Sequence, residues 1–190
     1  MAGNTGLGQA KKVGTCMPEK TQYVLSLNDS DTVTNKIEKM YAHKNNIKHI
    51  AFSVFIYNDN HEMLIQKRAQ DKYHSGGLWS NTCCGHPISD DVQYEARERL
   101  KYEMGIDVDI NKLFSFSYCT AFSHGLYENE LDYVYVGKFN GNPIANPLEV
   151  ENCKWVDYDD LLRKIVLNNS DYTYWFNLSV SRVIEHLKGR

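Results

Sequence analysis

The stretch "GLWSNTCCGHP", from Gly77 to Pro87, is the most distinctive run of the chain and the starting point for predicting its fold. Two adjacent thiols can hardly form a disulfide with each other without strain, and Gly-His-Pro is a poor continuation of either a helix or a strand. The segment is therefore predicted to be a shaped loop that presents side chains, among them Cys84 and His86.

Length and composition around this stretch are those of an ordinary globular protein. The chain has 190 residues, of which 42% are hydrophobic and 24% are charged. A chain of this length buries roughly 70% of its unfolded surface as one domain. The net charge of -3 gives no reason to expect a nucleic-acid or anionic-membrane partner. No segment approaches the ~18 consecutive apolar residues of a membrane span.

The cysteines and the N-terminal residues bear on location and domain organisation. The five cysteines are Cys16, Cys83, Cys84, Cys119 and Cys153. No CxxC spacing indicates a zinc site or a redox pair, so we expect a reducing, cytoplasmic compartment. Residues 1–20 lack the apolar core of a signal peptide or membrane anchor. We expect a flexible arm over 1–20 and, because no repeat or low-complexity linker follows, a single domain over 21–190.

Hydrophobic patterns predict several strands. They lie at 21–28, 49–57, 62–68, 113–121, 130–139 and 153–158. The turn composition of "NDNH" between the second and third predicts a β-hairpin.

Helices are predicted between these strands and at the end of the chain. Apolar residues recur at four-residue spacing over 91–104, with Ser89 and Asp90 as candidate caps and Gly105 as the stop. Asp157 is a candidate cap for a helix over 158–167, and "WFNLSVSRVIEHL" predicts a last helix. Strands with a few interspersed helices predict an α+β or mixed α/β domain.

Three histidines and two glutamates form an inventory of possible metal ligands: His43, His49, His86, Glu128 and Glu130. In "YENELDY" the two glutamates are two residues apart, so an extended run points both carboxylates to one face of a sheet. Nitrogen and oxygen donors suit Zn²⁺, Mn²⁺ or Mg²⁺. Surface or capping histidines and solvated glutamates on an edge strand would give the same pattern.

The two neighbouring thiols and two aromatic residues are further candidates. Cys84 lies in a Gly-bounded turn beside a possible cation, an environment that lowers the pKa of a thiol and suits it to proton transfer or nucleophilic attack. Cys83 is by default a small buried hydrophobe, and structural roles for both remain open. Residues such as Tyr118 and Trp175 are most often core or rim residues, and their local spacing does not indicate otherwise, although an indole face in an apolar cleft can stabilise a cation.

Scattered basic residues form the last group: Lys39, Arg68, Lys72 and Arg99. Such cations usually belong to a solvated face. However, "QKRAQDK" follows a strand and Arg99 shares a helix face with Glu103, an arrangement that suits a phosphorylated ligand bridged by a metal.

The order of the motifs "YAHKNNIKHIAFS", "IQKRAQDK", "LWSNTCCGHP", "YEMGI", "ENE" and "YWF" closely resembles type 1 isopentenyl diphosphate isomerase over about residues 21–180. The resemblance implies a Nudix-like fold, a mixed sheet sandwiched by helices. It implies one divalent metal (Mn²⁺, Mg²⁺ or Zn²⁺) on His43, His49, His86, Glu128 and Glu130. Glu103 would hold a Mg²⁺ that arrives with the substrate diphosphate, which Lys39, Arg68, Lys72 and Arg99 would face.

The activity implied by the resemblance is the reversible isomerisation of isopentenyl diphosphate to dimethylallyl diphosphate in isoprenoid biosynthesis. A proton adds at carbon-4 and another leaves carbon-2 through a tertiary carbocation. Glu130, assisted by Tyr118, would deliver one proton and Cys84 as thiolate would take the other, or the reverse. Trp175 would stabilise the developing charge. We thus expect a small-molecule substrate and a monomer or weak dimer.

Two other functions were considered, and the sequence differs from the family's pattern in one loop. A Nudix hydrolase usually carries an Arg-Glu pair and a double Glu before the helix-ending Gly, but these positions read Glu98-Arg99 and Tyr102-Glu103. A non-enzymatic binding domain would not need the acid and base positions that are occupied here. In "YHSGGLW", Ser75-Gly76 stands where many relatives have a bulky residue and proline, which predicts a looser loop.

Overall fold

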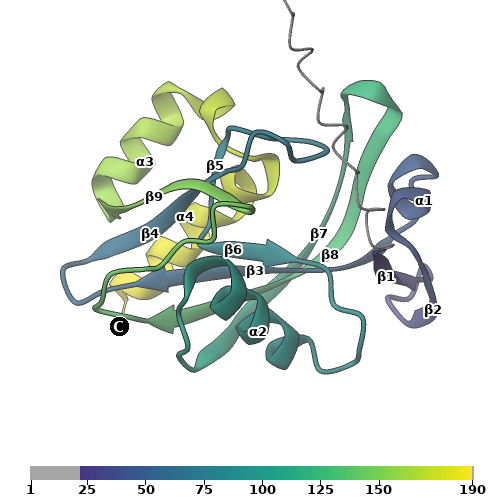
Figure 1. Ribbon diagram of the computed structural model, residues 1–190, viewed down its shortest axis with the longest axis horizontal. Helices are drawn as coiled ribbons and strands as arrows, with labels where there is room; N and C mark the ends of the chain where they lie inside the picture. The colour runs from purple at the N-terminus through teal and green to yellow at the C-terminus, as the bar shows by residue number, and fades with distance from the viewer. Residues whose placement is uncertain (1–21, 190) are drawn as a thin grey trace, which may run out of the picture.

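The computed structural model describes residues 22–189, so the arm predicted over residues 1–20 lies outside the described part of the chain. Within 22–189 the chain forms nine strands in one mixed sheet and four α-helices (Figure 1). The strands are β1 (Tyr23–Leu27), β2 (Val33–Glu38), β3 (His49–Tyr57), β4 (Glu62–Arg68), β5 (Trp79–Ser80), β6 (Cys83–Gly85), β7 (Ile110–Phe122), β8 (Leu126–Lys138) and β9 (Val150–Asp157). The helices are α1 (Lys39–Lys44), α2 (Val92–Met104), α3 (Tyr158–Leu167) and α4 (Tyr174–Lys188).

Strand β3 is the centre of the sheet. It pairs in parallel with β8 along its whole length, from His49 opposite Glu130 to Tyr57 opposite Lys138, and β8 pairs antiparallel with β7. Successive parts of β3 also pair with β1, β6 and β4, and β4 in turn pairs with β5 and β9. The predicted hairpin is confirmed, because β3 and β4 are antiparallel neighbours.

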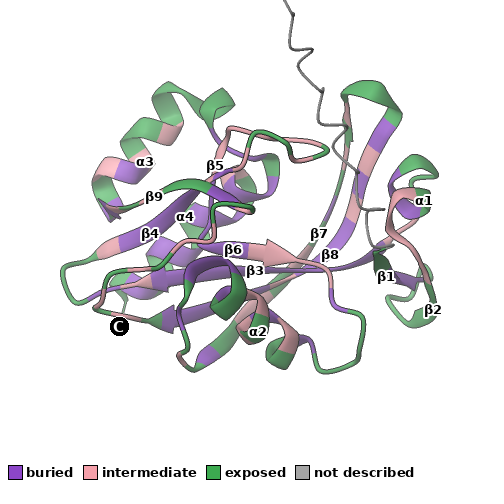
Figure 2. Cartoon of the chain, in the orientation of Figure 1, coloured by how far each residue is buried: buried purple, intermediate pink, exposed green. Residues whose placement is uncertain are grey.

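Helices cover both faces of this sheet because successive side chains of a strand point in opposite directions. Phe52, Val54 and Ile56 of β3 belong to the core cluster that contains the apolar face of α2. Phe55 belongs to the other cluster and stacks on Phe176 of α4, with ring centroids 5.9 Å apart. Figure 2 shows β3 buried along nearly all of its length. The predicted sandwich of a mixed sheet between helices is confirmed.

The stretch Gly77–Pro87 departs from the predicted shaped loop, because part of it is built into the sheet. Cys83–Gly85 forms β6, in which Cys84 lies opposite Ser53 of β3. Just before β6, the side chain of Thr82 links the chain to β3 and β4. Its Oγ1 accepts from the Ile56 N–H at 2.9 Å and donates to the Leu64 carbonyl at 2.5 Å. A buried hydroxyl thus replaces ladder hydrogen bonds where the polar sequence gave no strand signal.

The predicted helices are present, with one correction at a cap. Ser89 and Asp90 do not cap α2; the carboxylate of Asp91 does, by accepting from the backbone N–H of Tyr94 at 3.1 Å. Gly105 ends the helix at φ 65° as predicted, a conformation that glycine adopts without steric cost. No helix in residues 22–189 is long and apolar enough to cross a bilayer.

Like β5 and β6, the elements β2 and α1 had no sequence signal. The strand β2 is mostly exposed and shows no apolar alternation, and α1 is only six residues long, too short for a helical period to be recognised. Glu38 fixes the start of α1, because its carboxylate accepts from the N–H groups of Met40 and Tyr41 at 2.8 and 2.6 Å. This short helix positions His43 and begins with Lys39.

Candidate active site

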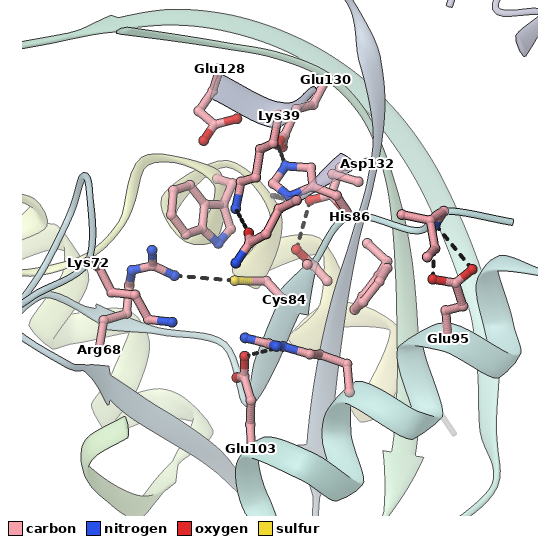
Figure 3. A pocket seen from close by; sticks show the side chains of 18 of the residues that line it. Lys39, Arg68, Lys72, Cys84, His86, Glu95, Glu103, Glu128, Glu130 and Asp132 are labelled. Carbon is pink, nitrogen blue, oxygen red and sulfur yellow. Dashed lines mark hydrogen bonds and ion pairs between the residues drawn. The ribbon is translucent and has the colours of Figure 1, made fainter. Parts of the chain in front are cut away.

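A pocket of about 660 Å³ gathers most of the residues singled out by the sequence. Its lining includes Lys39, Arg68, Lys72, Cys84, His86, Arg99, Glu103, Tyr118, Glu128, Glu130 and Trp175. His43 and His49 are fully buried and are not part of that lining. Figure 3 shows Cys84 between Glu130 and His86 on one side and Glu103 on the other, with Arg68 reaching toward its sulfur.

The histidines and glutamates predicted as metal ligands form a compact group. His43, His49, His86 and Glu128 each offer a ligand atom, and these atoms lie within 4.8 Å of one another. Glu130 adjoins the group through Oε1, which is 2.8 Å from Nε2 of His86 and 3.5 Å from Nε2 of His49. Alternation along β8 puts both carboxylates on one face of the sheet, as predicted.

Backbone carbonyls orient two of the imidazoles. Nδ1 of His43 lies 2.9 Å from the carbonyl oxygen of Tyr127, and Nδ1 of His49 lies 2.8 Å from that of Ile47. A carbonyl oxygen only accepts, so each Nδ1 carries the proton and Nε2 is the atom with a free lone pair. This is the common arrangement of metal-binding histidines. The hydroxyl of Tyr73 lies 3.3 Å from Nε2 of His43.

The group has the electrostatics of a cation site. Nε2 of His49 and Oε2 of Glu128 are buried without a hydrogen-bond partner in residues 22–189, which is costly in a protein interior. Burial and the neighbouring charge of Glu130 raise the pKa of Glu128 well above its usual value. Without a cation this pair of buried carboxyls therefore keeps a proton, which a divalent metal would replace. The residues fit such a metal.

Cys84 is half-buried beside a cation, but its thiol does not have the lowered pKa expected from the sequence. Nη1 of Arg68 lies 3.6 Å from the sulfur. Burial nevertheless raises the pKa of Cys84 to about 11, against the smaller opposing effect of Arg68. The expectation is wrong because removal of the sulfur from water favours the neutral thiol more than one guanidinium favours the thiolate. Cys83, by contrast, is fully buried in the core cluster on the α2 side of the sheet.

Glu130 has the opposite protonation preference. The hydroxyl of Tyr118, its register partner on β7, donates a 2.5 Å hydrogen bond to Oε2 of Glu130. Burial opposes ionisation of this carboxyl, but the contacts with His49 and His86 outweigh it and hold the pKa of Glu130 well below its usual value. The pocket therefore contains a protonated thiol on Cys84 and an ionised carboxylate on Glu130.

The four predicted cations, Lys39, Arg68, Lys72 and Arg99, line the same pocket as Cys84. Arg99 donates from Nη2 to Glu149 at 2.8 Å, and Lys72 pairs with the same carboxylate. Burial lowers the pKa of Lys39 to about 8, because the charges of Arg68, Lys72 and Arg99 act in the same direction and together with burial outweigh the opposing charge of Glu128. Gathering like charges is unfavourable unless an anion joins them, so this half of the pocket is suited to an anionic ligand.

Glu103 lies among these cations on α2. Its carboxylate accepts from Nε of Arg99 at 2.7 Å and from Nε2 of Gln66 at 3.0 Å. The predicted i, i+4 relationship with Arg99 is thus present. Only 4% of Glu103 is exposed, so its charge lies at the base of the pocket.

Trp175 is fixed on the pocket wall by its ring nitrogen. Nε1 donates to Oδ1 of Asn81 at 3.1 Å, and the guanidinium of Arg68 lies 5.2 Å from the ring. Asn81 also donates to the Cys83 carbonyl at 2.5 Å. The "WSNT" run thus ties the tryptophan to the strand that carries the cysteines.

Sequence reasoning missed two polar residues of the site. His74 contacts Glu128 from the loop that follows β4, and nothing in its local spacing distinguished it. Asp132 accepts from the Ser53 hydroxyl at 2.8 Å, and burial raises the pKa of Asp132 to about 8. The alternation that placed Glu128 and Glu130 on one face also reaches Asp132, so this signal was present in the sequence.

Comparisons with known proteins agree with this geometry. A family model for the NUDIX domain matches residues 47–176. Isopentenyl-diphosphate Delta-isomerase 2 of Aromatoleum aromaticum is 40% identical over 162 residues, which cover 85% of this chain and 86% of that protein. Isopentenyl-diphosphate Delta-isomerase of Pectobacterium atrosepticum is 35% identical over 164 residues, covering 86% and 92%.

Solved structures are similar in fold. A protein of Deinococcus radiodurans has a TM-score of 0.63 at 19% identity, covering 77% of this chain and 90% of that one. A MutT NUDIX hydrolase of Burkholderia pseudomallei has a TM-score of 0.57 at 19% identity, covering 72% and 98%. At these identities the likeness concerns the fold, and the predicted Nudix-like fold is confirmed.

Proposed function

We propose that Cys84 and Glu130 carry out the two proton transfers of an isomerase. The chain belongs to the isopentenyl-diphosphate Delta-isomerases of the NUDIX-domain family, which convert isopentenyl diphosphate to dimethylallyl diphosphate. The observation that carries this proposal is the meeting of Cys84 and Glu130 in one pocket with opposite protonation preferences. Moving the double bond needs one acid and one base on the five-carbon unit.

The protonation states of Cys84 and Glu130 in the pocket without substrate support one direction of proton transfer as the first. With the proton on Sγ of Cys84 and none on Glu130, Cys84 would protonate carbon-4 and Glu130 would remove the proton from carbon-2. The product leaves the protein with the proton on Glu130, and the reverse reaction begins from that state. The opposite assignment, with Glu130 as the first acid, requires a proton to move from sulfur to carboxylate beforehand.

A divalent metal in the His/Glu group is part of the proposal. His43, His49, His86, Glu128 and Glu130 would hold it, and when bound it supplies positive charge that favours the ionised form of Glu130. Tyr118 holds Oε2 of that carboxylate in place. The two oxygens of Glu130 are thus both engaged, which fixes the direction from which it meets the substrate.

The diphosphate would occupy the cationic half of the pocket. Lys39, Arg68, Lys72 and Arg99 supply the charge, and the carboxylate of Glu103 would hold a Mg²⁺ that arrives with the diphosphate. To bind that ion, Glu103 must exchange part of its present pairing with Arg99. Arg99 would then be available to the phosphate oxygens.

Trp175 would face the hydrocarbon. A tertiary carbocation must be kept from water and from nucleophiles, and an indole face stabilises positive charge without being alkylated as a carboxylate would be. Its 5% exposure and its fixed ring nitrogen support this role. We also propose a cytoplasmic monomer or weak dimer; the four free thiols in the described residues are consistent with a reducing compartment.

Proton NMR of isopentenyl diphosphate in D₂O with Mg²⁺ tests the proposal. The protein should produce dimethylallyl diphosphate that carries solvent deuterium, and Cys84→Ala and Glu130→Gln should not. Unchanged substrate with the wild-type protein would refute the isomerase. Isomerisation that survives in either variant would refute its assigned proton-transfer role, and phosphate release without isomerisation would indicate a hydrolase.

A further inference from the structure

His74 is a buried imidazole next to the metal-binding group that has no assigned role. It lies in the segment between β4 and β5, and its Nε2 contacts Oε1 of Glu128. Apart from this contact, Nε2 has no polar partner in residues 22–189. The ring stacks on Phe122, with centroids 4.8 Å apart and an interplanar angle of 10°. The ring of Trp175 is nearly perpendicular to it, with centroids 5.8 Å apart.

The two oxygens of Glu128 point to different neighbours. Oε2 faces the buried histidines, at 3.5 Å from Nδ1 of His43 and 3.8 Å from Nε2 of His49. Oε1 faces His74. One carboxylate oxygen is therefore directed to the metal-binding group, and the other is in contact with an imidazole outside it.

The contacts also fix which nitrogen of His74 carries its proton. Once a metal has displaced the proton of the Glu128 carboxyl, that carboxylate only accepts hydrogen bonds, so the nitrogen that faces it must be N–H. Nδ1 then has the lone pair, and the hydroxyl of Ser75, 3.1 Å away, is placed to donate to it. A protonated Nε2 has no lone pair with which to bind a metal.

We propose that His74 is a positioning residue: oriented by Ser75, it donates from Nε2 to Oε1 of Glu128 and thereby holds Oε2 toward the metal. The inference rests on the proposed metal site. Partners of this kind typically change metal affinity or activity by about 10–100-fold when they are removed.

The segment that carries His74 is held tightly enough for this task. The backbone N–H of Gly77 donates to the Arg68 carbonyl at 3.0 Å, and the N–H of Arg68 donates to the Leu78 carbonyl at 3.0 Å. A Cβ at Gly76 would lie only 2.3 Å from the carbonyl oxygen of Gln70. Glycine at position 76 therefore permits a close approach that a proline there would prevent in this conformation.

Zinc binding by the full chain tests the proposal without relying on catalysis. His74→Phe keeps an aromatic ring on Phe122 but removes both nitrogens, and His74→Gln keeps an amide donor. Zn²⁺ affinity, measured by competition with a chelator, should fall about 10–100-fold in His74→Phe and recover in large part in His74→Gln. His124→Asn, an exposed histidine in the turn between β7 and β8, is the matched control.

Zinc X-ray absorption separates positioning from direct ligation. The number of imidazole ligands should be the same in wild type and His74→Phe; one fewer imidazole in the variant would overturn the positioning role. Equal Zn²⁺ affinity of His74→Phe and wild type would also overturn it. Circular dichroism and the Tm of the metal-free variants establish that they are folded. A wild-type chain that binds no metal would instead refute the proposed metal site itself.

Discussion

The hydroxyl of Tyr118 lies 2.5 Å from Oε2 of Glu130, while Nε2 of His86 lies 2.8 Å from the other oxygen. The carboxylate is thus held from two elements, β7 and the residue that follows β6. A group fixed in this way needs little rearrangement during proton transfer, which is the basis of electrostatic preorganisation.

Tyr118→Phe removes one of these two supports. A hydrogen bond to a charged group contributes about 1.5–3 kcal/mol, so we expect kcat to fall about 10–100-fold with little change in metal content. Steady-state kinetics and metal analysis of the purified variant check this. Tyr133→Phe, a half-buried tyrosine on β8 whose ring contacts Lys112, serves as the control. Equal losses of activity in the two variants would argue against a role for the Tyr118 hydroxyl.

Lys39 should give the enzyme an alkaline limit. Its pKa of about 8 means that the ammonium loses its charge as pH rises through 8, and the free enzyme then binds the diphosphate less well. The decline should appear in kcat/KM, which reports the free enzyme, and not in kcat, since bound diphosphate would raise this pKa. In Lys39→Arg the limit should move upward, because a guanidinium stays charged. An unchanged profile in that variant would assign the limit to another group.

The fold was predictable where the sequence had a period. The apolar repeat of α2 and the apolar runs of β3 and β4 predicted these elements, and Gly105 marked the helix end correctly. The short strands β5 and β6 were not predictable, because the polar side chains between them are held by tertiary hydrogen bonds. Local sequence carries no record of such partners.

The candidate site also has features that the sequence predicted and features that it did not. Two-residue spacing predicted that Glu128 and Glu130 share a face, because a strand has a fixed alternation. The approach of His43 and His49 depends on a turn and a short helix, and the resemblance to a known family supplied it. The pKa of Cys84 was predicted in the wrong direction, because burial depends on the whole fold and exceeds the effect of one neighbouring cation.

Removal of the metal should lower stability. Oε2 of Glu128 and Nε2 of His49 are buried without hydrogen-bond partners in the described residues, so a bound cation would satisfy them. A ligand at 100 times its Kd stabilises by about 2.7 kcal/mol, equivalent to a Tm increase of about 5–10 °C for a chain of this size. Scanning calorimetry with added Zn²⁺ or with a chelator measures it. Glu128→Gln should lose most of the metal-dependent increase; a full increase in that variant would exclude Glu128 as a ligand.

Cys84 should react slowly with alkylating agents at neutral pH. Its half-buried thiol has a pKa of about 11, whereas the thiolate is the reactive form. Iodoacetamide labelling followed by peptide mass spectrometry should modify exposed Cys119 well before Cys84 at pH 7, with the Cys84 rate rising as pH increases toward 9. Faster labelling of Cys84 than of Cys119 at pH 7 would show that its thiolate is stabilised after all.

Asn81 should be a centre of stability for the pocket wall. It is fully buried, and its Oδ1 accepts from Trp175 Nε1 at 3.1 Å and from the Ser80 hydroxyl at 2.9 Å. Asn81→Ala leaves buried donors unpaired, and each unpaired donor costs about 1–3 kcal/mol of stability. We therefore expect the free energy of unfolding to fall by about 3 kcal/mol and the Tm to fall by about 6–12 °C. Trp175→Phe keeps a ring but lacks the N–H. A double-mutant cycle of these two substitutions should give a coupling of about 1 kcal/mol, since they remove the same hydrogen bond; additive losses would mean that this bond does not hold the tryptophan in place.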